Sequence, residues 1–111
     1  MKKSTYRELF DLTGRTALVT GAVGILGRHF CEGLAEFGAN VVVVDLAEDT
    51  CAEFAEELRG RYGVRARAIG CDVSDASSVR EMVERAVVEM GSIHVLHNNA
   101  ATKTDDLDAF F

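Results

Sequence analysis

The sequence contains no proline and no tryptophan, and only 3 of its 111 residues are cysteine. Without proline there is no proline-rich linker, and neither a low-complexity run nor a shift in composition marks a domain boundary. An odd number of cysteines without a C-x-x-C pair argues against a disulfide framework or a zinc site. We therefore interpret Cys31, Cys51 and Cys71 as small apolar residues of a core.

Long apolar runs and an excess of basic residues are also missing. No stretch approaches the roughly 18 apolar residues of a membrane helix, and the start, MKKSTYRELF, lacks the apolar segment of a secretory signal. A formal net charge of −6 leaves no basic footprint for nucleic acid. The rest of the composition, 48% hydrophobic and 27% charged, is typical of one small globular domain. These features predict a cytoplasmic protein that binds neither membranes nor nucleic acid.

Short β-branched runs recur along the chain and predict strands. The runs 16–20 and 41–44 are typical of strands buried on both faces of a parallel sheet. The segments 65–71 and 93–97 are weaker candidates. Amphipathic stretches separate the four segments, and this alternation predicts a parallel sheet with right-handed crossovers. The expected fold is therefore α/β, a Rossmann-like doubly wound sheet with strand order 3-2-1-4, incomplete at the C-terminal side.

Three stretches between these strands carry apolar residues at helical spacing. The first stripe consists of Leu26, Phe30, Leu34 and Phe37. Each predicted helix ends at a glycine: Gly38, Gly63 and Gly91. The predicted N-caps are Asp49 or Thr50 for the second helix, and Ser74 or Asp75 for the third. We interpret these stripes as core faces rather than as parts of a site.

The first predicted strand runs into TGAVGILG at 20–27 and then into the first helix. A glycine-rich turn in this setting directs backbone N–H groups at an anion. Gly21 would allow the tight turn, and Gly24 would let a pyrophosphate approach the backbone. Gly27 would let the helix pack closely on the strand. The spacing is G-x-x-G-x-x-G rather than the G-x-G-x-x-G of the dinucleotide fingerprint, so a purely structural role is the alternative.

Two acidic residues follow the second and third predicted strands. The carboxylate of Asp45 could accept hydrogen bonds from the ribose hydroxyls of adenosine. It would repel a 2′-phosphate, and no arginine follows it closely, so NAD is favoured over NADP. The alternative is a solvated aspartate at a strand end. For Asp72, a helix-capping role and adenine recognition are equally open, and Arg28 is interpreted as solvated rather than as a phosphate ligand.

Taken together, four features resemble the short-chain dehydrogenase/reductase family, from about Leu12 onward. They are TGAVGILG at 20–27, Asp45, CDV at 71–73 and NNAA at 98–101. The resemblance implies an NAD-dependent oxidoreductase that transfers a hydride to or from an alcohol or carbonyl substrate, sugars included. It also implies a homo-oligomer when the fold is complete.

The resemblance further implies which residues contact the cofactor. The pyrophosphate would be bound by the turn, that is by Thr20, Gly21, Val23, Gly24, Ile25, Leu26 and Gly27. Asp45 would hold the adenosine ribose, and Asp72 with the backbone of Val73 would contact the adenine. Leu46 would be a further contact of the cofactor. Asn98 and Asn99 would stabilise the end of the fourth strand, and the cofactor path would be lined by Asn99, Ala100 and Ala101.

The sequence departs from the family pattern in two motifs. The usual loop, TGxxxGxG, would place its second glycine at Ile25, whereas TGxxGxxG is the spacing of the extended branch of epimerases and dehydratases. NNAA, however, resembles the usual NNAG with its glycine replaced. The stretch 100–111 is similar to bacterial members linked to surface-polysaccharide or flagellin-sugar modification.

The family's catalytic groups, a serine and a tyrosine followed four residues later by lysine, have no counterpart here. Phe10 follows Tyr6 at that spacing, and Ala66 follows Tyr62. The lysines are Lys2, Lys3 and Lys103. We therefore expect residues 1–111 to be the N-terminal part of a dinucleotide-binding domain, with an open edge at its fourth strand that favours self-pairing. The alternatives are a nucleotide-binding module without chemistry and part of an extended-branch epimerase or dehydratase.

The histidines offer no metal site in this sequence. His94 and His97 are three residues apart, which places them on opposite faces of a strand, and His29 falls in the first predicted helix. We interpret all three as structural or solvated.

Overall fold

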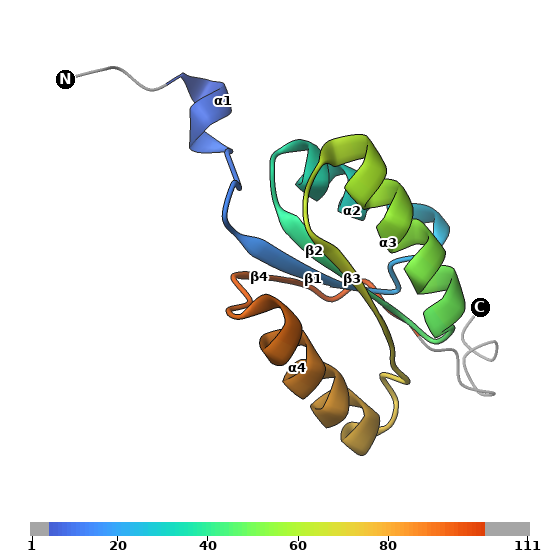
Figure 1. The fold of residues 1–111 in the computed structure, drawn as a ribbon. Coiled ribbons are helices and arrows are strands. Elements are labelled where there is room, and N and C mark those ends of the chain that lie inside the picture. The colour runs from blue at the N-terminus through green and yellow to red at the C-terminus, as the bar shows by residue number, and fades with distance from the viewer. Residues whose placement is uncertain (1–4, 102–111) are drawn as a thin grey trace, which may run out of the picture.

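The computed structural model describes residues 5–101, which form one parallel sheet flanked by helices (Figure 1). The strands are β1 (Thr16–Thr20), β2 (Asn40–Asp45), β3 (Ala66–Gly70) and β4 (Val95–His97). The helices are α1 (Tyr6–Leu9), α2 (Ile25–Glu36), α3 (Glu48–Tyr62) and α4 (Ala76–Met90). The order β3-β2-β1-β4, with every pair parallel, confirms the predicted Rossmann-like sheet. The three lysines, and all but the start of the stretch likened to sugar-modification proteins, lie outside the described residues.

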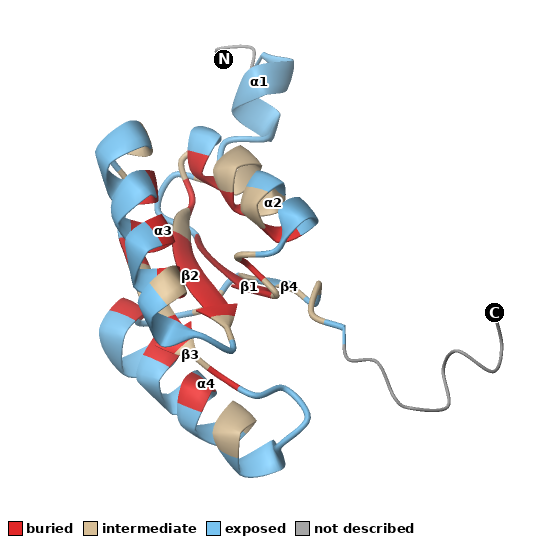
Figure 2. Cartoon of the chain, turned by 90° about the vertical axis from the view of Figure 1, so that its right-hand side faces the viewer, coloured by how far each residue is buried: buried red, intermediate tan, exposed pale blue. Residues whose placement is uncertain are grey.

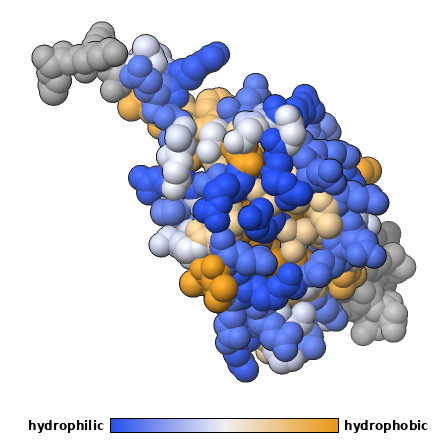
Figure 3. Space-filling view, in the orientation of Figure 1, coloured by the Kyte–Doolittle hydropathy of each residue, from blue (hydrophilic) through white to orange (hydrophobic). Residues whose placement is uncertain are grey.

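The two central strands, β1 and β2, are buried on both faces of the sheet, with α2 and α3 on one side and α4 on the other (Figures 1 and 2). Successive valines of β2 alternate between the two cores. Val41 and Val43 pack with α2 and α3, whereas Val42 and Val44 pack with α4. This is why the valine run lacks the polar residues of a half-exposed strand. On the face seen in Figure 3, the surface is mostly hydrophilic and its apolar side chains lie in separate patches.

The helix ends largely follow the predicted signals. Gly63 has a φ of 69° and ends α3, and Gly91 has a φ of 83° and ends α4. Asp75 caps α4 by accepting a hydrogen bond from the Ser77 amide at 3.0 Å. The predicted start of the second helix was wrong. The residue before α3 is Ala47, which makes no capping bond through its side chain, and the helix begins at Glu48.

The short helix α1 was not predicted, although the sequence signals it. Thr5 and Glu8 form a capping box, in which the Thr5 amide donates to Glu8 Oε2 at 3.0 Å and the Glu8 amide donates to Thr5 Oγ1 at 3.2 Å. No residue of α1 is buried, and the helix stands away from the sheet (Figure 1). Within residues 5–101, no helix is long and apolar enough to cross a membrane.

The buried thiols of Cys31 and Cys51 predict a loss of stability at alkaline pH. Burial raises the pKa of Cys31 to about 12 and that of Cys51 to about 11. Unfolded thiols ionise near pH 8.5, so this contribution is fully present below that pH and is lost as the pH rises. Above about pH 9, the free energy of unfolding in urea should fall by up to about 1.4 kcal/mol per pH unit for each thiol.

The double variant Cys31→Ala/Cys51→Ala is the control for this prediction. Its free energy of unfolding should depend less steeply on pH between about 9 and 10.5 than that of the parent chain. Equal slopes for the two chains would show that the thiols do not set the alkaline limit.

Candidate functional site

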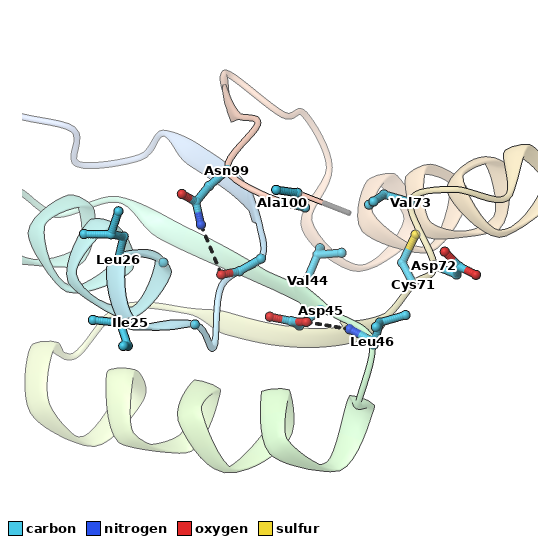
Figure 4. Close-up of a pocket in the computed structure, with 14 residues that line it drawn as sticks. Ile25, Leu26, Val44, Asp45, Leu46, Cys71, Asp72, Val73, Asn99 and Ala100 are labelled. Atoms are coloured by element: carbon cyan, nitrogen blue, oxygen red, sulfur yellow. Dashed lines mark hydrogen bonds between the residues drawn. The ribbon is translucent and has the colours of Figure 1, made fainter. Parts of the chain in front are cut away.

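A pocket of about 480 Å³ lies where the strands of the sheet reach their carboxyl ends (Figure 4). It is lined by Gly21, Gly24, Ile25, Leu26, Gly27, Val44, Asp45, Leu46, Cys71, Asp72, Val73, Asn99, Ala100 and Ala101. This is the edge of an open α/β sheet at which ligands bind. Every residue assigned to the cofactor from the sequence lines this pocket except Thr20 and Val23.

The glycines of the turn at 20–27 have different reasons to be glycine. Gly21 has a φ of 63°, and a Cβ there would lie 3.0 Å from the Cα of Ala100. A Cβ on Gly27 would collide with the carbonyl oxygen of Gly21. At Gly24 the nearest atom to a Cβ is 3.4 Å away, which is an ordinary contact. The fold therefore requires glycine at Gly21 and Gly27. At Gly24 the packing of the turn does not require glycine.

Three backbone amides at the start of α2 have no hydrogen-bond partner among the described residues, and the residues that carry them line the pocket. Within α2, the first amide to donate a hydrogen bond back along the chain is that of Arg28, which donates to the Gly24 carbonyl at 3.0 Å. The amides of Ile25, Leu26 and Gly27 precede this bond. No acidic residue lies in the first turn of α2. The positive end of this helix is therefore available to an anion in the pocket.

Asp45 closes the strand β2 and holds two backbone amides. Its Oδ2 accepts from the Val23 amide at 3.1 Å, and its Oδ1 accepts from the Leu46 amide at 2.8 Å, the latter drawn in Figure 4. A carboxylate offers about four lone-pair positions, so acceptor capacity remains for a ligand. Besides lining the pocket, Asp45 thus braces the glycine turn, a role that the sequence did not indicate.

Thr20 and Asn99 join the turn to the segment that leaves β4. The buried Thr20 hydroxyl accepts from the amides of Asn99 at 3.1 Å and Ala100 at 3.0 Å. The Asn99 side-chain amide donates to the Gly21 carbonyl at 3.2 Å (Figure 4). The Thr20 hydroxyl therefore makes internal hydrogen bonds and does not line the main pocket. With Asn98 it lines a second, apolar pocket between β4 and α4 instead.

Asp72 occupies the opposite rim of the main pocket. Its Oδ1 accepts from the Ser74 amide at 3.0 Å and from the Ser74 hydroxyl at 2.6 Å. These bonds, the hydroxyl first, lower the pKa of Asp72 below its ordinary value. The side chain closes a local turn, and Asp75 rather than Asp72 caps α4. Cys71, beside Asp72, also lines the pocket, whereas its sequence pattern indicated only a small apolar residue.

The remaining candidates from the sequence have structural partners. Val23 packs against the core beneath α2 and α3. The Arg28 Nε donates to the Val23 carbonyl at 3.1 Å, and its guanidinium lies 4.8 Å from the centre of the Phe54 ring. Arg28 is therefore half-buried and stabilises the turn, so its interpretation as a solvated residue was wrong.

Two of the histidines also have partners, as the sequence interpretation expected. His94 Nδ1 accepts from the Thr16 amide at 2.9 Å, and the His97 ring lies 4.3 Å from that of Phe30. Among residues 5–101, no group of three or more histidine, cysteine or acidic side chains is arranged to hold a metal ion.

The sequence and the fold match known proteins. The family model for short chain dehydrogenase matches residues 15–110. Oxidoreductase UcpA of Salmonella typhimurium is 43% identical over 89 residues, which are 80% of this chain and 33% of that protein. The crystal structure of L-sorbose reductase from Gluconobacter frateurii, complexed with NADPH and L-sorbose, superposes with a TM-score of 0.81 at 32% identity, over 86% of this chain and 36% of that one.

An NAD⁺-bound xylitol dehydrogenase gives a TM-score of 0.77 at 33% identity, over 82% of this chain and 35% of that one. The chain thus spans about a third of the length of these relatives. The match to the family model covers most of the sequence, and the solved relatives share the fold. The chain therefore belongs to the short-chain dehydrogenase family.

Proposed function

We propose that residues 1–111 form the N-terminal, adenosine-side part of a dinucleotide-binding domain, and that the pocket binds NAD in preference to NADP. The observation that carries this proposal is the position of Asp45, which lines the same pocket as the residues at the start of α2, Ile25 to Gly27. An anion site and a carboxylate at the adjacent strand end are what a diphosphate joined to a ribose requires. The two dinucleotide-bound relatives support a nicotinamide cofactor, NADPH in one and NAD⁺ in the other.

The residues present suit such a cofactor. The amides of Ile25 and Leu26 would bind the diphosphate, and Gly24, which lines the same pocket, carries no side chain that could obstruct it. Asp45 would accept hydrogen bonds from the ribose hydroxyls. Leu46 and Val73 stand on opposite rims of the pocket with 72% and 39% of their surfaces exposed, and would flank the adenine ring.

The preference for NAD follows from the charges of the pocket. No arginine or lysine is among the described residues that line it. The 2′-phosphate of NADP would therefore lie near the carboxylate of Asp45 without a cation to neutralise it. Asp72, on the other rim, adds a second negative charge to the same pocket.

When bound, the cofactor would supply hydride transfer to or from an alcohol or carbonyl group. The sorbose-bound and xylitol-dehydrogenase relatives favour a sugar or polyol as that substrate. In this chain the described residues would bind and orient the cofactor. The sequence has no tyrosine followed four residues later by lysine, so we expect nucleotide binding without turnover from the 111-residue chain.

Titration calorimetry of the 111-residue chain with NAD, NADP and ADP-ribose tests this proposal. NAD should bind at least about ten-fold more tightly than NADP. Asp45→Asn should weaken NAD binding about five- to ten-fold and reduce the difference between the two cofactors, because the charge is removed while one acceptor oxygen stays.

Asp49→Asn is the matched control, because it removes the same charge from α3 outside the pocket. Its affinities should equal those of the parent chain. A folded parent chain that binds none of the three nucleotides at millimolar concentration would overturn the proposal. Equal affinities for NAD and NADP would overturn the preference alone.

A further inference from the structure

The carboxylate of Glu48 connects both faces of the sheet around the outer edge of β3. Glu48 is the first residue of α3, and its Oε1 accepts from the Gly70 amide at 2.8 Å and from Arg85 Nη1 at 2.6 Å. Gly70 ends β3, and Arg85 belongs to α4, which covers the opposite face from α3 (Figure 2). One side chain thus joins two helices and a strand end.

The hydrogen bond from Gly70 to Glu48 gives the Gly70 amide an acceptor that no strand of the described part of the sheet provides. In the described residues β3 pairs with β2 alone, and at the end of that pairing the Cys71 amide donates to the Asp45 carbonyl at 2.8 Å. Since consecutive amides of a strand point to opposite sides, the Gly70 amide points to the outer edge. An amide there has no strand partner, and Glu48 provides the acceptor.

Gly70 also allows the start of α3 to lie directly against the strand. A Cβ on Gly70 would be 3.0 Å from the Cβ of Glu48, tighter than an ordinary contact. The close approach and the hydrogen bond together fix the distance between this strand end and the first turn of α3.

These two anchored residues adjoin the two rims of the pocket. Glu48 follows the rim formed by Asp45 and Leu46, and Gly70 immediately precedes the rim formed by 71–73. Glu48 itself does not line the pocket. The hydrogen bond to Gly70 therefore sets the distance between the two rims, and Glu48 does not contact a ligand directly.

We propose that Glu48 is a positioning residue for the adenosine half of the site, which it serves by holding the two rims at the spacing of an adenine ring. This inference rests on the proposed function. The Gly70 amide is the partner that matters for it. The ion pair with Arg85 joins side chains that are 49% and 46% exposed, and such surface pairs contribute little by themselves. Both partners, the Gly70 amide first, lower the pKa of Glu48 below its ordinary value, so the carboxylate is charged at neutral pH.

The test measures the dissociation constant for NAD by titration calorimetry, with each chain shown to be folded by circular dichroism. Glu48→Ala should weaken NAD binding about three- to ten-fold, the effect of losing one hydrogen bond that sets the spacing. Glu48→Gln should restore the affinity to within about two-fold, because its amide oxygen can accept from the Gly70 amide. If Glu48 acted only through its negative charge, the uncharged Glu48→Gln chain would bind NAD as weakly as Glu48→Ala.

Two further variants keep the test decisive. Asp49→Ala removes the other acid in the first turn of α3, whose side chain makes no hydrogen bond among the described residues, and should leave the affinity unchanged. Gly70→Ala keeps the carboxylate but pushes the strand end from the helix, and should weaken NAD binding as Glu48→Ala does.

The outcomes separate this inference from the proposed function. If the parent chain binds no NAD, both fail. If it binds NAD and Glu48→Ala binds within two-fold of it, only the positioning role fails. The role also fails if Glu48→Gln is as weak as Glu48→Ala, or if Asp49→Ala is equally weak, since charge at the helix start would then explain the loss.

Discussion

Replacing Gly27 by alanine is expected to unfold the chain or to lower its free energy of unfolding by at least about 3 kcal/mol, at the upper end of what overpacking costs. The new methyl group would occupy the space of the Gly21 carbonyl oxygen and would lie 2.9 Å from the carbonyl carbon of Ala22. Both are backbone atoms, so no side-chain rotation can relieve the collision. Urea unfolding followed by circular dichroism measures the loss.

Gly33→Ala is the matched control for this prediction. Gly33 belongs to the same helix, and nothing lies within 4 Å of the position that its Cβ would take. Alanine there should raise the free energy of unfolding by about 0.5–1 kcal/mol, because it favours the helix more than glycine does. Similar unfolding midpoints for the Gly27→Ala chain and the parent would contradict the close packing of the turn on α2.

Gly24→Ala is expected to lower NAD affinity at least about ten-fold while the fold stays intact. Gly24 has a φ of −73° and a ψ of 174°, which any residue adopts, and its Cβ would have only one neighbour, at 3.4 Å. The methyl group would instead be added to a residue that lines the pocket directly before Ile25 and Leu26, where we propose the diphosphate lies. Titration calorimetry measures the affinity.

Gly60→Ala serves as the control for that experiment, because Gly60 lies in α3 with open space around it and does not line the pocket. It should leave NAD affinity unchanged. A Gly24→Ala chain that binds NAD within two-fold of the parent would show that no diphosphate occupies this turn. An unfolded Gly24→Ala chain would contradict the structural account of this glycine.

Much of the fold could be predicted because its signals are local. The four valines of 41–44 indicate a strand buried on both faces, and Gly63 and Gly91 mark helix ends by the conformation that glycine permits. The strand order followed from the doubly wound pattern of such alternating elements. The turn and Asp45 were placed on one pocket for the same reason, since the carboxyl ends of parallel strands share an edge.

Apart from α1, whose capping box is local, the parts that were missed depend on contacts between distant segments. Thr20 shares its hydroxyl with the backbone at Asn99 and Ala100, and no pattern in either segment indicates that pairing. The start of α3 was misplaced because the favoured caps, Asp49 and Thr50, follow a residue whose side chain is held by β3. Local preference therefore yields to a long-range hydrogen bond at that helix.

The bonds between Thr20, Gly21 and Asn99 have a further consequence. They tie the glycine turn to the segment that leaves β4, because neither can shift without stretching hydrogen bonds to the other. Binding equilibria at coupled sites affect each other equally. If displacing Asn99 changes the affinity of a ligand for the turn, then that ligand changes the equilibrium for displacing Asn99 by the same factor. Nucleotide binding at the turn, as proposed above, would thus be coupled to the positions of Asn99 and Ala100 through these three hydrogen bonds.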